Sequence, residues 1–103
     1  MDVFVMMGTY ESDPFASVHL TEKYALIAAI QDVMDFLGIN DTEDFESRYC
    51  SEPADGLVVD HDAMKEMEAP QLRPIFLAWT QMDGVWDNCQ GYSVTVMKTK
   101  VTA

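Results

Sequence analysis

Hydrophobic side chains dominate the start of the chain, where residues 2–10 are apolar at nearly every position. Apolar residues at both odd and even positions are typical of a central strand that is covered on both faces. Residues 11–14 are turn formers, and residues 15–20 then alternate well enough to form a second strand. We therefore predict an N-terminal hairpin of two antiparallel strands.

The hydrophobic pattern changes to a helical spacing after Thr21, which has the hydroxyl expected of an N-cap. The apolar positions that recur every three or four residues are Leu26, Ile30, Val33 and Leu37. Gly38 is the residue type that ends helices in the left-handed conformation. The spacing predicts a helix over residues 21–37, with Asp32 and Asp35 facing away from the core.

A second helix is predicted over residues 42–49, where Asn40 or Asp41 can accept a hydrogen bond from a free amide of the first turn. Phe45 and Tyr49 lie one helical turn apart and would be buried together. The acidic side chains of this segment would then face solvent.

Irregular structure and short elements are predicted for the segment that follows. Pro53 and Gly56 indicate a loop, and residues 57–59 form a short strand. A short helix begins at Asp60 or Asp62 and continues to residue 68, and the prolines at positions 70 and 74 end it.

The C-terminal third returns to strand patterns. Residues 75–81 are strand-like, Asp83 and Gly84 are typical of a hairpin turn, and Gly91 marks a bend before the alternating residues 92–101. Together these elements predict an α+β fold with a mostly antiparallel sheet of about four strands. One main helix packs on a face of the sheet, and the middle of the chain adds short acidic helices.

Length and composition indicate one folded domain over residues 1–103, because 49% of the residues are hydrophobic. The longest apolar stretch, residues 25–30, is far shorter than the roughly 18 residues of a membrane-spanning helix. The N-terminus lacks the basic start and cleavage site of a signal peptide. We expect a cytoplasmic protein without a membrane partner, in which Cys50 and Cys89 are reduced.

Acidic residues are concentrated in the middle of the chain. Residues 32–68 contain twelve of the eighteen acidic residues and only two basic ones, Arg48 and Lys65. The first 31 residues carry a net charge of −3 and the last 35 carry +1. Such a local field repels nucleic acids and anionic membranes and attracts a basic protein surface.

The acidic segment has two interpretations. A solvated surface that keeps the protein soluble is the simpler one. However, this much charge on a small domain costs self-repulsion that solubility does not require. Because DNA carries a charge about every 1.7 Å of its axis, a row of carboxylates can imitate it to a nucleic-acid-binding protein. The residues predicted to contact such a partner are Asp32, Asp35, Asp41, Glu43, Asp44, Phe45, Glu46, Tyr49, Glu52, Asp55, Asp60 and Asp62.

Catalytic and metal-binding patterns are weak. Asp60, His61 and Asp62 could bind a metal or exchange protons, but adjacent side chains point in different directions, so helix capping is the better interpretation. The chain lacks the close Cys or His pairs of zinc modules, a glycine-rich phosphate loop and known hydrolase motifs. We therefore predict a protein that is not an enzyme and has no catalytic residue, metal or cofactor.

Taken whole, the chain resembles the small acidic proteins with which bacteriophages and mobile elements disable host machinery, such as anti-CRISPR and anti-restriction DNA mimics. The resemblance lies in a start at Met1, one short α+β domain, and the carboxylates interleaved around Phe45 in residues 39–46. It implies a non-catalytic, stoichiometric inhibitor that acts in the host cytoplasm on a CRISPR or restriction complex. The C-terminal third departs from mimics that are acidic throughout, which favours a local acidic patch.

Two hypotheses for function follow from the sequence. In the first, the acidic patch binds a basic protein surface, and aromatic residues such as Phe45, Tyr49 or an exposed Trp supply the desolvated contacts. In the second, the protein is a structural module whose apolar strands and helix face form a homodimer or dock on a larger complex.

Overall fold

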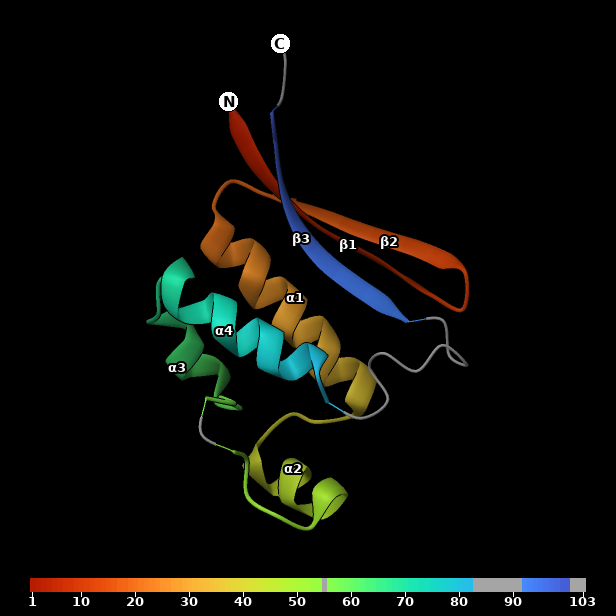
Figure 1. The fold of residues 1–103 in the computed structure, drawn as a ribbon, viewed down its shortest axis with the longest axis vertical. Helices are drawn as coiled ribbons and strands as arrows, with labels where there is room; N and C mark the ends of the chain where they lie inside the picture. The colour runs from red at the N-terminus through yellow and green to blue at the C-terminus, as the bar shows by residue number, and fades with distance from the viewer. Residues whose placement is uncertain (55, 83–91, 101–103) are drawn as a thin grey trace.

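The computed structural model of the protein describes residues 1–54, 56–82 and 92–100 and contains an antiparallel sheet with helices on one face (Figure 1). Its strands are β1 (Asp2–Tyr10), β2 (Asp13–His19) and β3 (Ser93–Lys100), in the order β2-β1-β3. Its helices are α1 (Glu22–Leu37), α2 (Thr42–Tyr49), α3 (His61–Lys65) and α4 (Ala69–Thr80). The α+β class is confirmed, but the described residues form three strands and not about four.

The predicted N-terminal hairpin is present, but its second strand spans Asp13–His19 and not residues 15–20, so the turn is shorter than the predicted residues 11–14. β1 pairs with β2 up to Tyr10 opposite Asp13, so only Glu11 and Ser12 form the turn. Both turn residues have positive φ angles, 50° and 72°, which is the geometry that matches the twist of the flanking strands. β1 also pairs with β3, so it is the central strand that the sequence predicted.

Helix α1 also has the predicted ends. The Thr21 side chain accepts a hydrogen bond from the Tyr24 amide, and Gly38 has a φ of 74° at the C-terminal end. The predicted apolar stripe is buried. Asp32 differs from the prediction, because it is half-buried and accepts a hydrogen bond of 2.5 Å from the Tyr92 hydroxyl.

Helix α4 occupies the segment where the sequence predicted a strand, over residues 75–81, so this prediction was wrong. Pro70 does not end a preceding helix. It lies in the first turn of α4, where an amide has no helical partner to lose. Glu68 and Gln71 form a capping box at the same turn, and Pro74 lies within the helix.

The spacing of buried residues explains why this segment is helical. Leu72, Ile75 and Trp79 are buried at intervals of three and four residues, whereas a strand would bury every second residue. The β-branched and aromatic composition of the segment suggested a strand. Packing of the apolar stripe against α1 outweighs that weak preference.

The middle of the chain gives mixed outcomes. Helix α2 forms as predicted, with Asp41 as its N-cap. Residues 57–59 pair with no described strand, so the predicted short strand was wrong, although two of their three side chains are buried. Helix α3 is capped by Asp60 as predicted, but it ends at Lys65 and not at residue 68.

Several predictions fall outside the described residues. These are the turn at Asp83 and Gly84, the bend at Gly91, and any contact of Asp55, Trp86 or Cys89. None of the helices in the described part of the chain is long and apolar enough to span a membrane.

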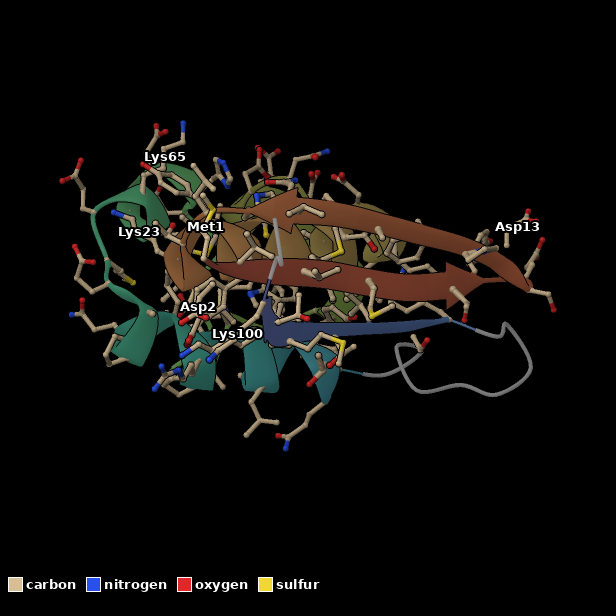
Figure 2. The ribbon with its side chains drawn as sticks, turned by 90° about the horizontal axis from the view of Figure 1, so that it is seen from above. Met1, Asp2, Asp13, Lys23, Lys65 and Lys100 are labelled. Carbon is tan, nitrogen blue, oxygen red and sulfur yellow. The ribbon has the colours of Figure 1, made fainter. Side chains whose placement is uncertain are left out.

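The sheet has one covered face and one open face. Helix α1 packs on the inner face, and within the described residues no helix or strand lies over the outer one (Figure 2). Alternation and strand register assign to this outer sheet face Val3, Val5, Met7, Thr9, Pro14, Ala16, Val18, Ser93, Thr95, Met97 and Thr99. None of these residues is charged. The expectation that β1 is covered on both faces fails at Met7, which is 38% exposed, although Val3 on the same face is only 4% exposed.

Candidate functional site

The carboxylates predicted to bind a partner lie in two separate places. Most of them belong to residues 41–62, which comprise α2 and the segment that leads into α3, at the end of the molecule away from the sheet (Figure 1). We call residues 41–62 the acidic end. Asp32 and Asp35 lie elsewhere, on α1, among aromatic side chains near the tip of the hairpin.

Hydrogen bonds at the start of α2 fix the local geometry of the acidic end. The Asp41 carboxylate accepts from the Asp44 amide at 2.8 Å, and the Asp44 carboxylate accepts from the Asn40 amide at 2.9 Å. Both carboxylates lie near the positive end of the helix dipole, which stabilises negative charge. Asp44 is half-buried, so its main role is to hold α2 in place.

Two adjoining hollows bring carboxylates of the acidic end together. One has a volume of about 320 Å³ and the other about 350 Å³. Thr42, Val59 and Asp60 line both hollows, so the two form one continuous surface. The carboxylates that line one or both of them are Asp41, Glu46, Glu52, Asp60 and Asp62, and all five are exposed.

Positive charge compensates this surface very little among the described residues. Lys65 contacts Asp62 at 3.6 Å, but both side chains are largely exposed, and such pairs contribute about 0–1 kcal/mol. Arg48 instead lies over the Tyr49 ring, with its guanidinium 5.6 Å from the ring centroid, and donates a hydrogen bond to the Tyr49 hydroxyl. The other four carboxylates form no ion pair with a described residue.

The predicted aromatic contacts need a correction. Phe45 is only 4% exposed and packs against Tyr49 and Trp79, with ring centroids 4.8 and 6.3 Å apart. Its ring therefore packs α2 against the core and is not available to a partner. Tyr49 is half-buried, and Glu43 is exposed on α2 but lines neither of these two hollows.

The triplet around His61 has the structural role that its spacing suggested. Asp60 accepts hydrogen bonds from the amides of Asp62 and Ala63 and so caps α3. His61 lines the smaller of the two hollows and is half-buried. Within the described ranges, no group of three or more His, Cys, Asp or Glu side chains is arranged to hold a metal ion.

Asp32 and Asp35 line a second feature, which the sequence did not predict. We call it the aromatic cleft. It has a volume of about 520 Å³ and is lined by Tyr10, Phe15, Asp32, Asp35, Phe36 and Tyr92. Because these residues come from β1, β2, α1 and the residue before β3, no local pattern links them, and only the tertiary structure brings them together.

Burial and the bond to Asp32 raise the pKa of the Tyr92 hydroxyl well above its ordinary value of about 10. Tyr92 therefore remains a neutral hydrogen-bond donor in the folded protein, and it holds the half-buried Asp32 carboxylate at the cleft.

Comparison of the chain with protein families, with curated proteins and with solved structures gives no match.

Proposed function

We propose that the protein is a non-catalytic inhibitor or modulator that acts in the cytoplasm of a host cell, where its acidic end binds a basic surface of a nucleic-acid-binding protein. The observation that carries this proposal is the convergence of five exposed carboxylates around two adjoining hollows. A CRISPR or restriction complex is the kind of target that the resemblance to phage inhibitors suggests.

The charge of the acidic end supports this kind of partner. Residues 41–62 contain eight acidic residues and one basic residue, Arg48. A surface of this sign accelerates association with a Lys/Arg-lined groove and opposes direct contact with nucleic acid. The protein would therefore compete with nucleic acid for the groove without binding nucleic acid itself.

The hollows can bind a cationic side chain more strongly than a flat charged surface can. An exposed ion pair contributes only about 0.2–1 kcal/mol, so isolated carboxylates would bind weakly. A lysine or arginine side chain that enters a hollow is partly removed from water and meets more than one carboxylate, which strengthens each charged contact. Specific binding is thus expected to depend on several of these carboxylates together.

Two matched variants test the proposal. The first carries Glu46→Gln, Glu52→Gln and Asp60→Asn, which neutralise one hollow. Because asparagine caps helices about as well as aspartate, Asp60→Asn leaves the start of α3 intact. The control carries Glu11→Gln, Asp13→Asn and Glu66→Gln, which neutralise exposed carboxylates outside residues 41–62. Each variant removes three negative charges from the total of −12.

Binding of an oligolysine peptide is measured by fluorescence anisotropy at rising salt concentration. The first variant should bind at least about tenfold more weakly than the wild type, and the control less than about threefold. Proteins captured from a lysate at low salt are then purified and tested for DNA binding. The wild-type chain should inhibit that binding at stoichiometric concentration, and the first variant should not. Equal effects of the two variants, or no inhibition of any captured nucleic-acid-binding protein, would overturn the proposal.

The outer sheet face supports a second candidate function, a homodimeric assembly module. Val18, Met97 and Met7 are 65%, 49% and 38% exposed on a face without charged residues. The acidic end lies away from the sheet, so two copies can meet through their outer sheet faces without bringing the acidic ends together (Figure 1).

Sedimentation separates the two functions. A dimer formed through the outer sheet face should become stronger as salt screens the repulsion between two chains of charge −12. Val18→Glu should abolish it, whereas Leu77→Glu, at a similarly exposed position on α4, should not. A monomer at all protein and salt concentrations would exclude this second function.

A further inference from the structure

The aromatic cleft combines flat rings with uncompensated carboxylates. Tyr92 and Phe36 are stacked, with ring centroids 4.1 Å apart and an interplanar angle of 11°. Tyr10 stands edge-on to Phe36, at 5.7 Å and 72°, and forms a partly exposed wall. Phe15 lies 6.3 Å from Tyr92 on another side. Four aromatic rings therefore line a space of about 520 Å³, and the Tyr10 ring is the most exposed of them.

Both carboxylates of the cleft keep an oxygen for a further partner. Asp32 accepts from the Tyr92 hydroxyl through Oδ2, and Asp35 accepts from the Gln31 side-chain Nε2 at 3.0 Å through Oδ1. Neither carboxylate forms an ion pair with a residue in the described part of the chain. They are one helical turn apart on α1, so both can face one ligand.

A cation is the ligand that matches this arrangement. The faces of aromatic rings attract positive charge, and a carboxylate beside them pairs with it in a partly desolvated site. A planar guanidinium can in addition stack on a ring and donate two parallel hydrogen bonds to a carboxylate, which an ammonium cannot do. We propose that the aromatic cleft binds the guanidinium group of an arginine side chain.

This inference rests on the proposed function only in that a basic protein partner would supply the arginine. The cleft shares no lining residue with the two hollows of the acidic end, so the two surfaces can be tested independently. If both are correct, one partner contributes cationic groups to two separate positions on this protein.

The probe is Nα-acetyl-arginine methylamide, titrated into the full chain and followed by amide chemical shifts. The controls are the citrulline analogue, which has the shape of arginine without its charge, and the lysine analogue. We expect saturable shifts at Tyr10, Asp35, Phe36 and Tyr92 with a dissociation constant in the millimolar range, and weaker binding of both controls.

Two variants with a matched control locate the site. Asp35→Asn and Tyr10→Leu should each weaken arginine binding at least about threefold, whereas Glu66→Gln, which removes the same charge elsewhere, should not change it. Equal binding of citrulline, tighter binding of lysine, equal effects of Asp35→Asn and Glu66→Gln, or no saturable shift would each overturn the inference. Loss of oligolysine binding in the hollow variant is a separate result that tests only the acidic end.

Discussion

The acidic end and the outer sheet face differ in charge and polarity. The acidic end places exposed carboxylates on and around two short helices, each of which has an aspartate as its N-cap. The outer sheet face carries no charge and exposes apolar side chains from a continuous strand ladder. The net charge of −12 is therefore not spread evenly over the surface of the molecule. One region is suited to long-range attraction and the other to short-range apolar contact.

The two regions should also respond differently to salt. Attraction at the acidic end weakens as salt screens exposed charges, with a screening length of about 8 Å at physiological ionic strength. Apolar contact at the outer sheet face gains from the same screening, because repulsion between copies falls. Salt dependence is therefore a simple way to tell which surface a binding event uses.

The largest expected effect comes from the residue that joins the acidic end to the core. Trp79 is fully buried, packs against Phe45 and donates a hydrogen bond of 2.9 Å from Nε1 to the Val58 carbonyl. Trp79→Ala should lower the free energy of unfolding in urea by about 3–5 kcal/mol. Leu77→Ala, at an exposed position on the same helix, should change it by less than about 0.5 kcal/mol. Similar losses for both variants would contradict the described core.

A smaller effect is expected from the cap that holds α2. Asp41→Ala removes the acceptor of the Asp44 amide and should cost about 1 kcal/mol, whereas Asp41→Asn should cost little. Faster amide exchange confined to α2 would show that the acidic end opens before the sheet. Uniform loss of protection in α2 and the sheet would contradict this separation.

The smallest changes in the free energy of unfolding are expected when carboxylates with and without a cationic partner are neutralised. Glu46→Gln with Glu52→Gln should raise the free energy of unfolding at low salt by a few tenths of a kcal/mol, because repulsion is relieved. Glu22→Gln should lower it, since Glu22 hydrogen-bonds to Arg73, and this contact lowers the pKa of Glu22.

The pH dependence of the Glu22 contribution has a defined sign. Its pKa is lower in the folded protein than in the unfolded chain, so its stabilisation is present above the unfolded pKa of about 4.3. It is lost as the pH falls through the folded value. Urea unfolding of wild type and Glu22→Gln between neutral and acid pH should therefore converge at low pH, and a constant difference would contradict the assignment.

Local patterns predicted the elements whose signals lie close together in sequence. Thr21, the apolar stripe and Gly38 define α1, and alternation defines the hairpin and β3. Helix α4 was missed because its composition suits a strand and because both prolines were taken as helix ends, whereas Pro70 lies in the first turn and Pro74 lies within the helix. For the acidic end, the sequence predicted the residues but not which of them share a hollow.

Tertiary placement explains what the sequence could not reveal. Tyr10, Phe36 and Tyr92 are far apart in sequence, and only the packing of α1 on the sheet makes them one cleft. Phe45 was expected both to be buried and to contact a partner, and its burial leaves only the first role. The sequence also did not predict that the outer sheet face is open, because a covered and an uncovered apolar strand have the same composition.

The most direct test of the central claim is to map an oligolysine peptide onto the wild-type protein by amide chemical shifts at low salt. Binding through the acidic end predicts that the largest shift changes cluster in residues 41–62, that they disappear with rising salt, and that the outer sheet face remains unaffected. Shift changes spread evenly over the molecule, or concentrated on the sheet, would contradict the account.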